Sequence, residues 1–170
     1  MRNPNKYALL TLAAVLAAGS ALCSASDLVP EARYSGLSSQ GSRVDLSQIG
    51  AYNRANVDQS GLRQRLVEVQ SGLANTAAIS QSGAYNAAYA QQSGYANAIT
   101  LEQSGRYNQA AIAQAGTTNQ ANVVQSGAYN QAYVGQYGQN NLANVTQSGF
   151  GGTVSVQQYG SNMNATVTQK

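Results

Sequence analysis

Side-chain amides recur along this 170-residue chain at a fixed spacing and are the first groups to consider for chemistry. From residue 48 onward, glutamine returns every eleven residues, and a glycine follows two residues after almost every one of these glutamines. An amide carries N–H donors and a carbonyl acceptor, so its chemistry is hydrogen bonding. The spacing therefore predicts a repeated hydrogen-bonding element, and internal repetition of this kind determines the architecture.

The groups that enzymes commonly use are scarce. The chain has no His, and its one cysteine, Cys23, lies in a segment that we expect to be removed. Serines recur beside the glutamines without a base near them, so no nucleophilic constellation is formed. The acidic residues form neither a close pair nor a calcium-loop pattern: Asp27, Glu31, Asp45, Asp58, Glu68 and Glu102. We predict no catalytic residues, no metal site and no cofactor.

Composition argues against an ordinary globular core and against nucleic acid as a partner. Charged residues make up 9% of the chain, and there is no Trp. Disordered chains are typically charged and aperiodic, which this chain is not. Nucleic-acid platforms combine aromatic rings with a basic groove, but Arg106 is the only charged residue between Gln103 and Gln169. We therefore interpret the tyrosines as packing residues of turns and outer faces.

The N-terminal segment has the pattern of a secretory signal. Arg2 and Lys6 precede an apolar run, and small residues follow, which predicts a signal peptide over residues 1–25. A lipidated Cys23 is the alternative, although the bulky Leu22 before it is unfavourable. Residues 26–41 include Pro30 and predict a flexible leader. Residues 42–170 then contain the repeat and no cysteine, so disulfides do not stabilise it.

Each repeat alternates in the way a half-buried strand does. With glutamine as position 1, asparagine is usual at position 6, alanine at 8, an aliphatic residue at 10 and the next glutamine at 12. Variable, mostly polar residues separate them, which predicts a strand of about seven residues with one buried face. Because eleven is odd, a straight strand would reverse its faces in each unit, so the Ser-Gly step is predicted to be a tight turn.

Tyrosine spacing indicates how many strands form one coil. Tyr85, Tyr107 and Tyr129 are 22 residues apart, which favours two strands per coil. We predict an all-β, two-sheet parallel β-solenoid of the cross-β type, with about six 22-residue coils made of twelve strand–turn units. The predicted core amide ladder comprises Gln48, Asn53, Gln59, Gln70, Asn75, Gln81, Asn86, Gln92, Asn97, Gln103, Asn108, Gln114, Asn119, Gln125, Asn130, Gln136, Asn141, Gln147, Gln158 and Gln169. The predicted turn glycines are Gly50, Gly61, Gly72, Gly83, Gly94, Gly105, Gly116, Gly127, Gly138, Gly149 and Gly160.

Two places depart from a uniform solenoid. Glu68 falls at an inward position, and because burial of an unpaired carboxylate is costly, we expect a local bulge that turns it outward. The alternative is a coil of deliberately low stability that delays folding until after export. At the other end, only Lys170 follows the last strand, so no polar cap covers it. We predict a polymerisation edge there, formed by Met163, Ala165, Val167 and Gln169.

Units such as Gln103–Gln114 resemble the Q-x-G-x-x-N-x-A-x-x-x-Q repeat of curlins, and the resemblance extends over roughly residues 42–169. Curlins are the subunits of curli, the extracellular functional amyloid of bacterial biofilms. The resemblance implies export through the periplasm and a dedicated outer-membrane pore with accessory factors, assembly with other curlin subunits, and a place in cell-surface fimbriae that support adhesion.

The irregular second unit and the ending after Asn162 are more similar to the minor, nucleating curlin than to the major one. The minor subunit tends to have basic final repeats, and here only Lys170 is basic after Arg106. A major, fibre-forming subunit is the alternative. A soluble ice- or carbohydrate-binding β-solenoid is a more distant one.

Overall fold

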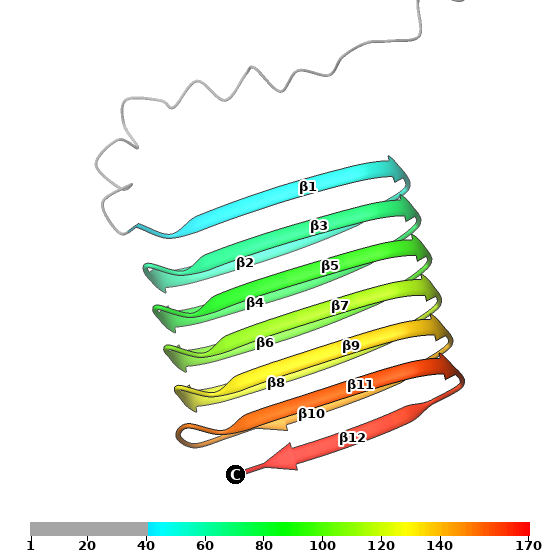
Figure 1. The fold of residues 1–170 in the computed structure, drawn as a ribbon. Helices are drawn as coiled ribbons and strands as arrows, with labels where there is room; N and C mark the ends of the chain where they lie inside the picture. The colour runs from blue at the N-terminus through cyan, green and yellow to red at the C-terminus, as the bar shows by residue number, and fades with distance from the viewer. Residues whose placement is uncertain (1–40) are drawn as a thin grey trace, which may run out of the picture. The chain divides into compact units, whose positions relative to one another are not determined.

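The computed structural model describes residues 41–170, so the predicted signal peptide and nearly all of the predicted leader lie outside the described residues. Twelve strands follow one another along this part of the chain (Figure 1). They are β1 (Arg43–Ala51), β2 (Arg54–Leu62), β3 (Arg65–Leu73), β4 (Thr76–Ala84), β5 (Ala87–Tyr95), β6 (Ala98–Arg106), β7 (Gln109–Thr117), β8 (Gln120–Ala128), β9 (Gln131–Gln139), β10 (Leu142–Gln147), β11 (Thr153–Ser161) and β12 (Asn164–Gln169).

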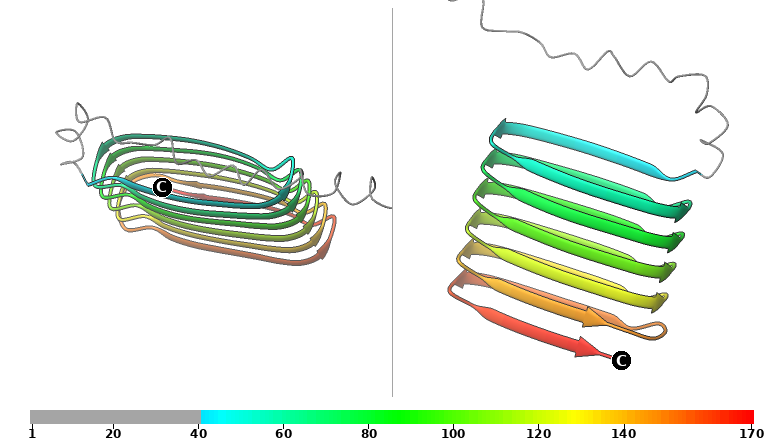
Figure 2. Two further views of the ribbon diagram at one scale, coloured as in Figure 1. Left: turned by 90° about the horizontal axis from the view of Figure 1, so that it is seen from above. Right: turned by 180° about the vertical axis from the view of Figure 1, so that it is seen from behind.

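Alternate strands form two separate parallel sheets. One sheet has the order β1-β3-β5-β7-β9-β11, and the other has the order β12-β10-β8-β6-β4-β2. Every paired residue lies 22 positions from its partner, as in Gln103 opposite Gln125. Figure 2 shows the resulting flattened coils stacked on one another, each built from one strand of each sheet. The predicted fold, a two-sheet parallel β-solenoid of about six coils, is confirmed.

The corners lie later in the repeat than the sequence indicated. β8 continues through Gln125, Ser126 and Gly127 to Ala128, and the chain turns at Tyr129 and Asn130. The prediction of a seven-residue strand followed by a turn at Ser-Gly was therefore wrong, because most strands have nine residues. The glycine bends the strand while its neighbours stay paired in the ladder. The residue before the asparagine then takes the left-handed conformation, with φ 60° at Tyr129.

Glycine is required in this bend for a second reason, the close approach of successive coils. Gly127 has φ +98°, and a Cβ added to it would lie 2.1 Å from the carbonyl oxygen of Gly149 in the next coil. Backbone atoms of the neighbouring coil cannot move aside without breaking the backbone hydrogen bonds between the coils. The glycine column therefore serves both the positive φ and the coil spacing.

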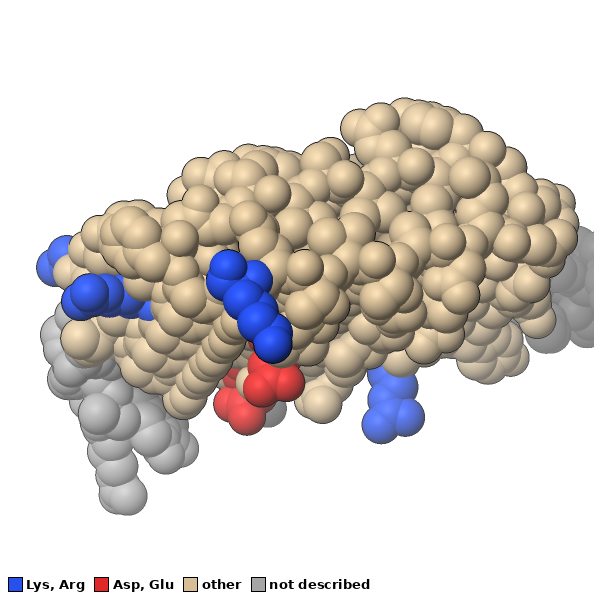
Figure 3. All heavy atoms as spheres, turned by 90° about the horizontal axis from the view of Figure 1, so that it is seen from below, with Lys and Arg blue, Asp and Glu red and all other residues tan. Residues whose placement is uncertain are grey.

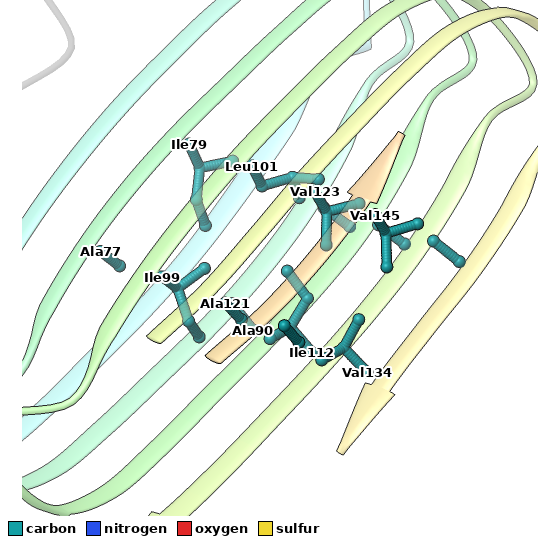
Figure 4. Close-up of a cluster of buried hydrophobic side chains, with 14 of the residues drawn as sticks. Ala77, Ile79, Ala90, Ile99, Leu101, Ile112, Ala121, Val123, Val134 and Val145 are labelled. Atoms are coloured by element: carbon teal, nitrogen blue, oxygen red, sulfur yellow. The ribbon is translucent and has the colours of Figure 1, made fainter. Parts of the chain in front are cut away.

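Small and branched aliphatic side chains fill the space between the two sheets (Figure 4). Ala121 and Val123 of β8 are fully buried, and equivalent positions of the neighbouring strands are occupied by Ala143 and Val145. Because like residues stack on like residues, the core repeats itself in every coil. In the part of the chain that the structure describes, no helix has the length and apolar character needed to span a bilayer.

Candidate functional site: the amide ladders and the open ends

Glutamine side chains form two continuous hydrogen-bonded ladders, one along each sheet. In one ladder, Gln103 Nε2 donates to Gln125 Oε1 over 2.8 Å, and Gln125 Nε2 donates to Gln147 Oε1 over 2.9 Å. In the other, Gln114 Nε2 donates to Gln136 Oε1 over 2.7 Å. In each of these bonds the donor lies on the earlier coil and the acceptor on the later one. The ladders therefore have a direction that runs from the N-terminal to the C-terminal end.

The second N–H of these glutamines ties one sheet to the other. Gln125 Nε2 donates to the backbone oxygen of Gln109 over 2.9 Å, and Gln136 Nε2 donates to that of Gln120 over 2.9 Å. In both cases the acceptor lies on a strand of the opposite sheet. Burying an amide without hydrogen-bond partners would cost free energy. In these glutamines Nε2 donates two hydrogen bonds and Oε1 accepts one, so this cost is avoided.

Asparagines act at the corners and do not repeat the glutamine pattern. Asn130 Nδ2 donates to the backbone oxygen of Ser126 over 2.8 Å, which closes its own corner. The same nitrogen donates to the oxygen of Gly149, and Asn130 Oδ1 accepts the backbone N–H of Gly152 over 3.0 Å. Each such asparagine therefore holds its own turn and positions the next coil. Side-chain-to-side-chain bonds between asparagines also occur, as from Asn97 to Asn75.

Burial divides the predicted ladder residues into interior and terminal members. All the predicted amides from Gln70 to Gln158 are at most 2% exposed. The other four lie in the terminal coils, where Gln48 is exposed and Asn53, Gln59 and Gln169 are partly buried. The sequence reasoning missed Gln64, which replaces asparagine at one corner and is 1% exposed. Its place in the eleven-residue register was the signal that could have identified it.

Glu68 contradicts the expected bulge. It stays in regular register between Leu46 of β1 and Ala90 of β5, and its side chain is 1% exposed. Neither carboxyl oxygen has a hydrogen-bond partner. Burial raises the pKa of the Glu68 carboxyl from 4.5 to about 7. The backbone of β3 is paired in parallel with β1 and β5, which leaves no room for an extra residue. The Glu68 side chain therefore remains inside and favours its neutral form.

The charges near Glu68 do not compensate it. Arg43 and Asp45 of β1 lie in an ion pair with each other, with 2.8 Å between Arg43 Nε and Asp45 Oδ2. Arg65, on the same strand as Glu68, is exposed. Figure 3 shows how few charged side chains interrupt the otherwise uncharged face seen in that view. Among residues 41–170, no group of three or more His, Cys, Asp or Glu side chains is placed to hold a metal ion.

Within residues 41–170, no further strand pairs with the last coil of the solenoid. Among the described residues, β11 pairs only with β9, and β12 pairs only with β10 (Figure 1). Of the predicted edge residues, Ala165 and Val167 pack partly buried against the core, and Met163 is 39% exposed. Gln169 Oε1 accepts the last ladder bond from Gln147 over 3.1 Å. β1 and β2 form the corresponding edge strands at the other end.

The fold and its ladders define the class of protein, a parallel cross-β solenoid whose core is hydrogen-bonded along its axis. A family model described as the curlin associated repeat matches residues 94–127, 116–149 and 138–170. Together these matches cover residues 94–170, so the C-terminal part of the solenoid is similar to the repeat of curlins. A search of curated proteins finds no match for the chain.

Proposed function

We propose that the chain is a subunit of curli, the extracellular amyloid fibre of bacterial biofilms, and that it assembles by stacking its solenoid ends. The observation that carries the proposal is the pair of glutamine ladders with a common direction. Each ladder has donors at one end and acceptors at the other. A second copy, or another curlin with the same repeat, is the partner that fits such an end.

The two ends of the chain also match in register. If a second copy continues the 22-residue spacing, its β1 follows β11 and its β2 follows β12. Gln48 of that copy then follows Gln158, and its Gln59 follows Gln169. Both acceptors, Gln48 Oε1 and Gln59 Oε1, lie on the first coil, because both residues donate to the next coil through Nε2.

The apolar columns continue across the same junction. Ala55 and Val57 of the added copy would follow Ala165 and Val167, so each column keeps its residue type. On the other sheet, Leu46 would follow Val156. Val44 and Leu46 are 43% and 48% exposed in the single chain, and stacking would remove this apolar surface from water. Association of this kind is head to tail, so all copies in the fibre point in the same direction along its axis.

Within this proposal, the leading role is the minor subunit that nucleates the major curlin at the cell surface. The atypical sequence of the repeat unit around Glu68 and the similarity of the C-terminal segment to that of minor curlins support this role. The match between the chain's own ends favours a second candidate, the major fibre-forming subunit. In both cases the partners are other curlins and the secretion pore with its accessory factors, and the predicted signal peptide supports export.

A seeding assay tests the proposal. The mature chain is added in trace amount to a monomeric major-type curlin, and fibre growth is followed by thioflavin T fluorescence. Loss of the partner's lag phase supports nucleation. Slow self-assembly without an effect on the partner supports the major-subunit role. A chain that stays monomeric at high concentration would refute both forms of the proposal.

A further inference from the structure

One corner of the solenoid has a continuous column of aromatic rings. The ring centroids of Tyr85 and Tyr107 are 4.8 Å apart with 9° between the ring planes, and those of Tyr107 and Tyr129 are 4.9 Å apart with 11°. Phe150 extends the column at 5.1 Å in a tilted orientation. At the other end, the Arg63 guanidinium lies over the Tyr85 ring at 5.7 Å from its centroid.

These rings occupy equivalent positions in successive coils and remain open to solvent. Each tyrosine takes the left-handed conformation at its corner, so its position repeats from coil to coil. Tyr85 and Tyr107 are each 39% exposed, and Tyr129 is 45% exposed. A small oxidant can therefore reach phenols that already have a second phenol stacked on them. Apolar stacking alone would not require the hydroxyl, because phenylalanine would pack in the same way.

We infer that this tyrosine column is a site of oxidative cross-linking, at which a one-electron oxidant joins consecutive coils through dityrosine. Each of two stacked phenols loses one electron and one proton and becomes a phenoxyl radical. The radicals couple through ring carbons ortho to the oxygens, and the two ring hydrogens then move to the oxygens. With hydrogen peroxide and a peroxidase as the oxidant, two tyrosines and one peroxide give one dityrosine and two waters.

A second stacked pair lies on β9 and β11, and other tyrosines supply internal controls. Tyr137 and Tyr159 have ring centroids 5.0 Å apart with 7° between their planes. Tyr52 and Tyr95 are 86% and 50% exposed and stack on no other ring within residues 41–170. Residues 41–170 contain no cysteine, so disulfides cannot join their coils.

The test treats the full mature chain with peroxidase and hydrogen peroxide, digests the dissolved product with trypsin and locates the linked tyrosines by fragmentation mass spectrometry, because Tyr107, Tyr129, Tyr137 and Tyr159 all lie in the tryptic peptide 107–170. Cleavage after Arg65 and Arg106 separates Tyr85 from Tyr107, so their link joins two peptides that are otherwise free. Mixing unlabelled and ¹⁵N-labelled chains distinguishes links within one chain from links between chains. The same treatment in denaturant serves as the control for random coupling.

We expect intrachain links at Tyr85–Tyr107, Tyr107–Tyr129 and Tyr137–Tyr159 to exceed links at Tyr52 or Tyr95 by roughly tenfold or more, because proximity raises the effective concentration. The Tyr107→Phe variant should lose the first two links and keep the third, whereas Tyr95→Phe should keep all three. Equal linking at Tyr52 and Tyr95, an unchanged pattern in denaturant, or no dityrosine would overturn the inference. None of these results depends on which curlin role the chain has.

Discussion

Replacement of Glu68 by leucine should stabilise the N-terminal coils above neutral pH. Leu101 occupies the position equivalent to Glu68 in β6 and is 1% exposed, so the core already accepts leucine at this point of the repeat. The small Ala90 lies directly next to Glu68 in the adjacent strand and leaves space for the larger side chain. The substitution removes an unpaired carboxyl and keeps an apolar contact.

The magnitude follows from the pKa of the Glu68 carboxyl. This pKa is raised from 4.5 to about 7 in the folded chain, because burial disfavours the charged form. Between these two values the unfolded chain has lost the proton while the folded chain still holds it, so stability falls as pH rises. The loss begins near pH 4.5, is complete near pH 7, and amounts to about 3 kcal/mol.

Hydrogen exchange is the appropriate assay, because the terminal coils of a solenoid can open without the rest. In the wild type, protection of β1 and β3 amides should decrease between pH 4.5 and pH 7, after correction for the intrinsic rate of exchange. The Glu68→Leu variant should lose this dependence. Glu102→Gln, a change at an exposed glutamate of β6, is the matched control and should retain it.

Protection of β1 and β3 that does not change over this pH range would refute the reasoning. So would a Glu68→Leu variant that is no better protected than the wild type at pH 8, since the buried charge would then carry no cost. The distribution of the effect is also informative. Equal loss of protection in β9 and β10 would show that the chain opens as one unit and not from its N-terminal end.

Three further substitutions address the ladders, the bends and the open edge. Gln136→Glu puts a charge into a buried glutamine ladder and should lower the free energy of unfolding by about 3–5 kcal/mol, as measured by chemical denaturation. Gln131→Glu, on the outer face, should change the free energy of unfolding little. Equal effects would contradict the inward and outward assignment. Gly127→Ala should cost more than Gly149→Ala, because both have positive φ but only the first Cβ meets backbone within 3 Å; equal melting temperatures would contradict this. Met163→Asn restores an amide at the last corner and should speed fibre elongation in thioflavin T kinetics, through one added hydrogen bond worth about 1 kcal/mol; slower growth would count against end stacking.

Much of the fold could be predicted from the sequence because the repeat is strict. Alternation at every second residue identified the buried face, and the tyrosine spacing identified two strands per coil. Both follow from side-chain geometry that is local to one strand. Gln64 was missed because its residue type differs from the asparagines, although its register is the same.

The tertiary structure decided three features that a single unit cannot encode. The corner falls at Tyr129 and Asn130, and not at Ser126 and Gly127, because the glycine bend keeps its pairing to the next coil. Glu68 stays inside because the backbone pairing of β3 with β1 and β5 fixes its register. Breaking that pairing would cost more free energy than burying the carboxyl.

The direction of the glutamine ladders is the third feature. Taken alone, a glutamine side chain could direct either its Nε2 or its Oε1 toward the C-terminal end of the solenoid. The direction is set by the N–H that must also reach a backbone oxygen of the opposite sheet, as Gln125 does to Gln109. The sequence by itself therefore determined that the chain forms repeated strands and which side chains of each strand face the core. Contacts between coils and between sheets determined where the chain turns, what stays buried and which way the ladders run.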